Sequence, residues 1–131
     1  MRGEPSCYLA GRMRGVPQFN YPAFMAGADA LRAAGWYVYN PAEMDLAADD
    51  PDPAFLTKTI KEQEAHAGNP ANARRYARRD CGVIIDQLRA EDGDAIVVLP
   101  GWEKSTGARA EVAVSRWVGL AVLTLEEALG E

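Results

Sequence analysis

The chain has 131 residues, of which 48% are hydrophobic and 25% are charged, a composition typical of a packed globular protein and not of a disordered chain. The formal net charge of −5 at pH 7 disfavours a nucleic-acid polymer as the main partner, because duplex binding normally requires a basic face that neutralises phosphates. We therefore expect one domain over residues 1–131, which can bury a core without disulfides or metals.

Four apolar runs of strand length follow one another along the chain. They occupy residues 7–11, 36–40, 94–100 and 120–125. Two of them are almost continuously apolar, which is typical of strands that are buried on both faces. We predict that all four are strands of one sheet.

Helical patterns lie between these runs. Residues 21–35 place Phe24, Ala28 and Leu31 on one face and end at Gly35, a common helix stop. Residues 106–119 form another predicted helix, with Ser105 as its N-cap.

The third predicted helix spans residues 71–90. It carries one apolar stripe, formed by Ala77, Cys81, Ile84 and Leu88. The spacing of this stripe is helical, so we expect it to pack against the sheet.

This alternation of strands and helices predicts an α/β fold, a three-layer Rossmann-like (flavodoxin-type) parallel sheet of four to five strands flanked by helices. Ligands of such sheets bind outside the carboxyl ends of the strands. Residues 42–70 are the least regular segment, with a short helix expected near 54–66. This segment is either a loop over a site or a plain surface insertion.

Cysteine and histidine are too sparse for a metal or disulfide framework. Cys7 and Cys81 resemble small buried hydrophobes, and the one histidine, His66, lies in a polar segment, so we expect no metal and no zinc site. The start of the chain lacks the apolar core of a signal peptide, and no run is long enough to cross a membrane. We therefore expect a cytoplasmic protein with no membrane contact.

Three strand ends meet at one predicted edge of the sheet, in the segments 11–15, 40–45 and 100–107. Glycines in these segments let backbone amides approach a ligand, and the helix start after Ser105 favours an anion. The glycines concerned are Gly11, Gly15, Gly101 and Gly107. Glycine-rich turns are also common structural joints, so this pattern alone is weak.

Two carboxylates strengthen the case for a site. Asp80 borders the stripe that should face the sheet, where a charge is rarely placed without a partner or a purpose. Glu111 follows early in the next helix, where it either faces a pocket or gains modestly from the helix dipole as an exposed residue. Two carboxylates beside one cleft are what cleavage of a glycosidic bond requires.

Arginines in the first loop offer guanidinium groups for a phosphate. Arg14 is one, and Ser105 adds a hydroxyl and an amide. Arg12 is the other, and pairing with Asp45, Asp49 or Asp50 is about as plausible for it. A further basic run at 73–79 is read first as a solvated helix face and second as a phosphate-binding surface.

Two aromatic residues each allow two interpretations. Tyr8 lies within the first strand and is expected to be mostly core, with a hydroxyl that reaches Glu111 or a sugar. Trp102 is either a loop anchor or a surface on which a base stacks.

The motifs "YLAGRMRG", "RRDCGVII" and "GWEKSTGARAE" together resemble a phage and bacterial family catalogued as a domain of unknown function (DUF4406), within the nucleoside 2-deoxyribosyltransferase-like superfamily. The resemblance covers nearly the whole chain except about 46–70. It implies a Rossmann-like fold and a homodimer or higher homo-oligomer in which a neighbouring subunit completes the site. We expect no cofactor. One departure is Arg12, which stands where proline usually follows "YLAG".

The resemblance also implies roles for individual residues. The catalytic glutamate of the family falls on Glu111, its aspartate on Asp80 and its strand tyrosine on Tyr8. The phosphate-contacting arginine and serine fall on Arg14 and Ser105, and an aspartate near the substrate falls on Asp94. The full set of expected substrate-binding residues is Gly11, Arg12, Arg14, Gly15, Asp94, Trp102, Ser105 and Gly107.

The leading hypothesis from these observations is an N-glycosidase that cleaves (deoxy)nucleoside 5′-monophosphates with Glu111 as nucleophile. The alternatives are a nucleoside 2-deoxyribosyltransferase, in which a second base replaces water, and a non-catalytic nucleotide-binding or sensing module. A nucleic-acid adaptor that uses the arginines of 73–79 is the weakest reading.

Overall fold

The computed structural model describes residues 3–47, 59–62, 65 and 69–131. Among these residues, no helix combines the length and the apolar character that crossing a membrane requires. The helix expected near 54–66 falls largely outside the described residues, although 60–62 are helical.

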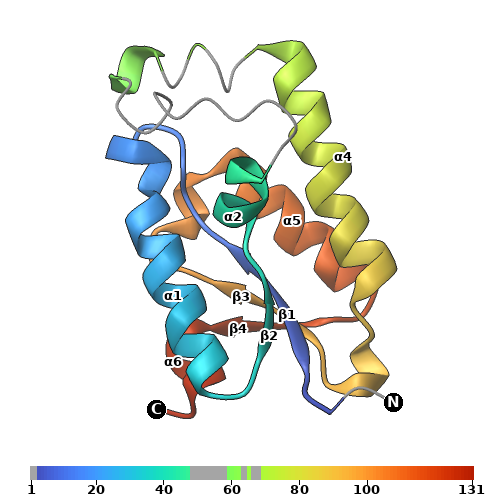
Figure 1. Ribbon diagram of the computed structural model, residues 1–131. Coiled ribbons are helices and arrows are strands. Elements are labelled where there is room, and N and C mark those ends of the chain that lie inside the picture. Colours follow the sequence, from blue (N-terminus) through green and yellow to red (C-terminus); the bar gives the residue numbers. More distant parts are fainter. Residues whose placement is uncertain (1–2, 48–58, 63–64, 66–68) are drawn as a thin grey trace.

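A four-stranded parallel sheet forms the centre of the molecule (Figure 1). Its strands are β1 (Ser6–Ala10), β2 (Tyr37–Tyr39), β3 (Ala95–Val98) and β4 (Ala121–Thr124), in the order β2-β1-β3-β4. In the register, Tyr8 pairs with Tyr39 on one side and with Ile96 on the other. The prediction of four strands in a parallel sheet is confirmed, and the order is that of a flavodoxin-like sheet without its fifth strand.

Apart from the helical residues 60–62, five helices surround the sheet within the described part of the chain: α1 (Tyr21–Ala33), α2 (Pro41–Leu46), α4 (Pro70–Gln87), α5 (Thr106–Trp117) and α6 (Leu125–Leu129). Short turns occupy Pro17–Asn20, Ala90–Asp92 and Trp102–Lys104. The three predicted helices are confirmed as α1, α4 and α5. The two short helices α2 and α6 were not predicted, although Asn40 caps α2 and Thr124 starts α6 in a capping box.

The sheet is covered on both faces, which gives three layers (Figure 1). On one face α1 and α6 pack against the sheet, and the buried residues there include Cys7, Leu9, Val97, Phe24, Ala28 and Leu31. On the other face α4 and α5 pack against Tyr8, Ala10, Ile96 and Val98 through Ile84, Leu88, Ala108 and Val112. Strand β1 thus sends alternate side chains to the two cores, as the pleat of a strand requires.

The apolar stripe of α4 divides into two parts, which corrects the prediction that all of it packs on the sheet. Ile84 and Leu88 are buried against the sheet. Ala77 and Cys81 lie one to two turns earlier and line a cavity instead. The middle of α4 therefore faces a cavity and its last turns face the core, so one helical stripe serves both.

Candidate active site

A cavity of about 300 Å³ opens at the carboxyl ends of β1 and β3, within the usual size range of small-molecule sites. The chain leaves β1 for β2 on one side and later returns to β3 on the other, so this is the point where the strand order reverses. Open α/β sheets bind their ligands at such switch points. The cavity is built by the segments that follow these two strands together with α4 and α2.

Glu111 and Tyr8 meet at the floor of the cavity. Tyr8 is 1% exposed, and its hydroxyl donates a hydrogen bond of 2.5 Å to Oε2 of Glu111. Burial raises the pKa of Glu111 to about 8, with a further rise from the charge of Asp80, while the Tyr8 hydrogen bond and Arg79 oppose the change. The interpretation of Tyr8 as a core residue whose hydroxyl reaches Glu111 therefore agrees with its position.

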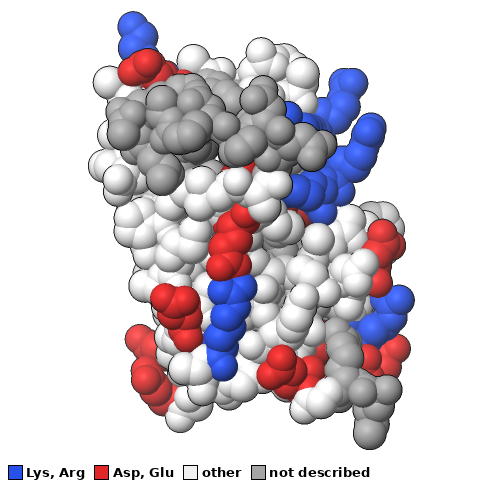
Figure 2. All heavy atoms as spheres, viewed as in Figure 1, with Lys and Arg blue, Asp and Glu red and all other residues white. Residues whose placement is uncertain are grey.

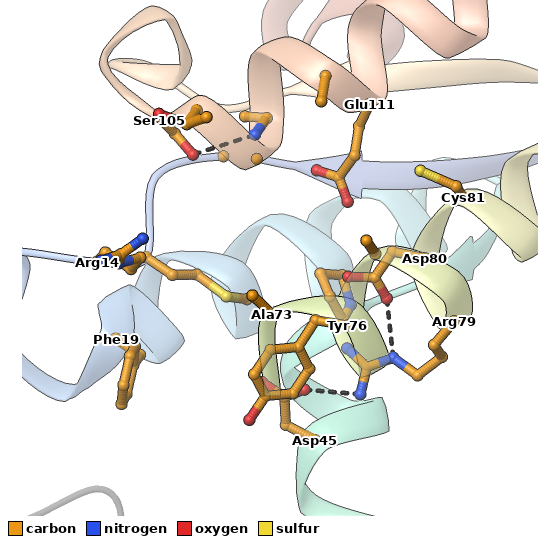
Figure 3. A pocket seen from close by; sticks show the side chains of 18 of the residues that line it. Arg14, Phe19, Asp45, Ala73, Tyr76, Arg79, Asp80, Cys81, Ser105 and Glu111 are labelled. Atoms are coloured by element: carbon orange, nitrogen blue, oxygen red, sulfur yellow. Dashed lines mark hydrogen bonds and ion pairs between the residues drawn. The ribbon is translucent and has the colours of Figure 1, made fainter. Parts of the chain in front are cut away.

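Asp80 points from α4 into the same space as Glu111 (Figure 3). It is 8% exposed and accepts a hydrogen bond of 2.8 Å from Nε of Arg79. Burial raises the pKa of Asp80, whereas the hydrogen bond and the charge of Arg79 lower it. Because Arg79 touches Asp80 directly, Asp80 is the carboxyl group of this pair that gives up its proton more readily.

A chain of polar contacts leads outward from Asp80 across three helices. Nη1 of Arg79 lies 2.7 Å from Oδ1 of Asp45 on α2. Oδ2 of Asp45 accepts a hydrogen bond of 2.5 Å from the hydroxyl of Tyr21 on α1. Asp45 is thus held by Arg79 and Tyr21, and the expected alternative in which Arg12 pairs with Asp45 is wrong; Asp49 and Asp50 lie outside the described residues.

Groups suited to an anion lie at the opposite end of the cavity (Figure 3). Arg14 is exposed there and makes no ion pair with another described residue. Ser105 begins α5, and its hydroxyl accepts a hydrogen bond of 3.1 Å from the amide of Ala108, which confirms it as the N-cap. Gly11 and Gly107 line the cavity beside them. The start of α5 and one guanidinium group therefore converge on this end.

Apolar side chains form the wall between these two ends. The described members of this wall are Met13, Phe19, Phe24, Pro41, Ala73, Tyr76 and Ala77. Phe19 takes its place through an unusual backbone, because Gln18, Phe19 and Asn20 all have φ between +52° and +60°. Such conformations are costly in non-glycine residues and concentrate at ligand sites. A side-chain hydrogen bond from Asn20 to the carbonyl of Arg12 spans this loop.

Four of the expected substrate-binding residues lie away from the cavity lining. Arg12 and Gly15 belong to the first loop, and Gly15 supplies a turn with φ of +81°. Trp102 packs on the core beneath α5, which matches the reading as a loop anchor. Arg12, Gly15 and Trp102 therefore belong to the loops around the cavity and do not line it; the fourth residue is Asp94.

Asp94 departs furthest from the expectation. It stands just before β3, at the opposite end of the strand from the cavity, where it is 2% exposed. Its carboxylate accepts hydrogen bonds of 2.8 Å from the backbone amides of Ser6 and Arg89. These two backbone amides satisfy the buried carboxylate of Asp94, so Asp94 stabilises the fold and does not contact a ligand in the cavity.

The basic run on α4 also divides. Arg74, Arg75 and Arg78 are exposed, and Figure 2 shows basic side chains gathered over the first half of this helix. Arg79 from the same run turns inward to the two aspartates. The expectation of a solvated helix face thus holds for three of the four arginines.

Several cavity residues were missed in the sequence. The sequence pattern groups Arg79 with the surface charges and gives Tyr76 no role, although both lie within about one turn of Asp80 on α4. Cys81 was expected to be buried but lines the cavity beside Glu111, and burial raises the pKa of its thiol. The sequence signal for a cavity position of Cys81 is that it directly follows Asp80. Among the described residues, no cluster of three His, Cys, Asp or Glu side chains could hold a metal ion.

The fold and the cavity together define a small α/β protein with a parallel sheet and an acidic pocket at its switch point. The chain belongs to the family described as Domain of unknown function (DUF4406), whose sequence pattern matches residues 5–67 and 60–124. No curated protein and no solved structure matches the chain significantly.

Proposed function

We propose that the protein is an N-glycosidase that cleaves nucleoside 5′-monophosphates, within the nucleoside 2-deoxyribosyltransferase-like superfamily. The observation that carries the proposal is the buried Glu111 carboxyl group, held by the Tyr8 hydroxyl at 2.5 Å and facing Asp80 at the carboxyl edge of the sheet (Figure 3). Glycosidic bond cleavage uses a carboxylate as nucleophile and a second one to manage protons.

The two carboxyl groups share one proton near neutral pH in this proposal. Glu111, with a pKa of about 8, holds the proton, and Asp80 is ionised beside Arg79. The Tyr8 hydroxyl donates its hydrogen bond to Glu111, and its proximity also lowers the pKa of Asp80 slightly. When a nucleotide binds, the proton moves from Glu111 to Asp80, which leaves Glu111 as the nucleophile.

The reaction then proceeds in two balanced steps. An oxygen of Glu111 forms a bond to C1′ as the bond from C1′ to the base nitrogen breaks, and Asp80 delivers its proton to the departing base. A water molecule next attacks C1′, gives a proton to Asp80 and releases the Glu111 carboxylate. The products are a free base and a sugar 5-phosphate.

In this proposal the phosphate binds at the other end of the cavity. Arg14 supplies a charge that no described residue neutralises, and the N-terminus of α5 at Ser105 and Gly107 supplies backbone amides. A guanidinium and a helix N-terminus are a common combination for phosphate binding. The base would lie against the apolar wall that includes Phe19 and Tyr76.

Two alternatives share this site. With a free base as acceptor in place of water, the same glycosyl intermediate gives a 2-deoxyribosyltransferase. The charge of Arg14, which makes no ion pair with a described residue, favours the phosphorylated substrate and hence hydrolysis. A nucleotide sensor without chemistry needs neither the raised pKa of Glu111 nor its contact with Tyr8. The homo-oligomer stays a prediction, and sedimentation of the purified protein tests it.

The test is incubation of the purified protein with a panel of ribo- and deoxyribonucleoside monophosphates, followed by chromatography of the free bases. The proposal expects release of base from at least one monophosphate, and faster release than from the matching nucleoside. A second free base in the mixture distinguishes transfer from hydrolysis, because transfer yields a new nucleotide. Binding of monophosphates without any release of base would instead favour the sensor.

A further inference from the structure

Arg79 occupies the middle of the acidic side of the cavity and bridges two helices. Its Nη1 lies 2.7 Å from Oδ1 of Asp45 on α2, and its Nε lies 2.8 Å from Oδ1 of Asp80 on α4 (Figure 3). A guanidinium group can serve two carboxylates at once because its N–H donors lie in a fixed plane. The contact with Asp80 therefore has a defined direction as well as a charge.

The outer side of Arg79 is also held. Tyr21 on α1 donates to Asp45 at 2.5 Å, and the Tyr76 ring lies 5.4 Å from the guanidinium carbon, within the range of a cation–π contact. The side chain of Arg79 is 26% exposed. Burial lowers the pKa of Arg79, but its hydrogen bond and ion pairs with Asp80 and Asp45 outweigh this, so the group stays charged.

The charge of Arg79 matters because Asp80 has mostly unfavourable neighbours. Besides burial, the nearby carboxylate of Asp45 raises the pKa of Asp80, and Glu111 and the Cys81 thiol lie on its other side (Figure 3). Arg79 lowers that pKa most, and the Tyr8 hydroxyl lowers it less. Arg79 is the cation that touches Asp80 within the described part of the chain.

We propose that Arg79 is a positioning residue that fixes the Asp80 carboxylate in orientation and keeps it ionised beside Glu111. This role rests on the N-glycosidase reaction proposed above, in which Asp80 must be able to receive the proton of Glu111. Without Arg79, burial and the charge of Asp45 favour the protonated form of Asp80, which makes Asp80 a poorer acceptor for the proton of Glu111. Arg79 itself touches neither the sugar nor the base.

The experiment follows the carboxyl group of Asp80 by NMR on protein labelled with ¹³C in the aspartate carboxyl groups, with Asp80→Asn to assign the signal. The variants are Arg79→Met, which removes the charge, and Arg79→Lys, which keeps the charge but lacks the planar fork. Arg78→Met is the matched control, because Arg78 is the adjacent and exposed arginine of the same helix. The kcat/KM of base release is measured over the same pH range.

We expect the midpoint of the Asp80 titration to rise by about one pH unit or more in Arg79→Met, a tenfold change in proton affinity, and by less in Arg79→Lys. The acidic limb of kcat/KM should move with it, while Arg78→Met matches the wild type. If Arg79→Met does not fold, the rise in Arg79→Lys decides. An unchanged Asp80 titration in the folded Arg79 variants, or an equal change in Arg78→Met, overturns the proposal. Absence of base release from the wild type would reject the glycosidase, while the NMR titration would still decide whether Arg79 holds Asp80.

Discussion

Replacing Glu111 by glutamine should stabilise the protein, and increasingly so as the pH rises. Burial raises the pKa of Glu111 from 4.5 to about 8. Between these values the unfolded chain loses a proton that the folded protein keeps, so the free energy of unfolding falls as the pH rises. The lost stability is about 3 kcal/mol at pH 7 and no more than about 5 kcal/mol above pH 8. Glutamine removes this cost and still accepts the hydrogen bond of Tyr8.

Urea unfolding, followed by tryptophan fluorescence, measures this effect. We expect the stability gain of Glu111→Gln to be about 3 kcal/mol larger near pH 8 than near pH 5. The control is Glu103→Gln, because Glu103 is an exposed glutamate shortly before α5. This substitution should not change stability differently at the two pH values. A gain that is the same at both pH values, or a loss of stability near pH 8, would show that Glu111 is not a buried protonated group.

Four further outcomes follow from the site. The kcat/KM of base release should fall above about pH 8 as the shared proton of Glu111 and its partner is lost; a rate that keeps rising with pH would contradict the shared proton. Tyr8→Phe should move this basic limb to higher pH, because the Tyr8 hydrogen bond lowers the pKa of Glu111, and an unmoved limb in the pH profile would reject that contact. Arg14→Gln should raise KM for a monophosphate about 10- to 100-fold, the loss of one charge-assisted contact, and leave KM for the nucleoside unchanged; equal changes for both would remove Arg14 from the phosphate site. Asp94→Asn should lower the free energy of unfolding by about 1–3 kcal/mol in urea titrations without changing nucleotide affinity, whereas weaker binding at equal stability would return Asp94 to the site.

Local patterns were enough to predict the sheet and its larger helices. The apolar runs that became β1 and β3 are continuous because both faces of these strands are covered, and the helices between them carry a clear period. The short helices α2 and α6 could not be predicted because five or six residues hold less than two full turns of periodic signal.

The parts of the site that depend on long-range geometry could not be predicted. The inward turn of Arg79 follows from Asp45 on a different helix, and nothing in the run "ARRYARR" separates this arginine from its exposed neighbours. Asp94, in contrast, could have been excluded from the site on the sequence alone. A residue that begins a strand lies at the end of the sheet opposite to the edge that binds ligands. The positions of Glu111 and Tyr8 could be predicted. Glu111 follows a strand end early in α5, and Tyr8 points from β1 to the face of the sheet that α5 covers.

The most direct test of the proposed mechanism is a search for the covalent intermediate on Glu111. The protein is mixed with a 2′-fluoro-substituted deoxynucleoside monophosphate, whose electron-poor sugar slows the second step, and then analysed by intact and peptide mass spectrometry. The mechanism predicts release of one base per chain and a sugar phosphate attached to the peptide that contains Glu111, with no adduct in Glu111→Gln. Base release without an adduct on that peptide, or an adduct that persists in Glu111→Gln, would contradict it.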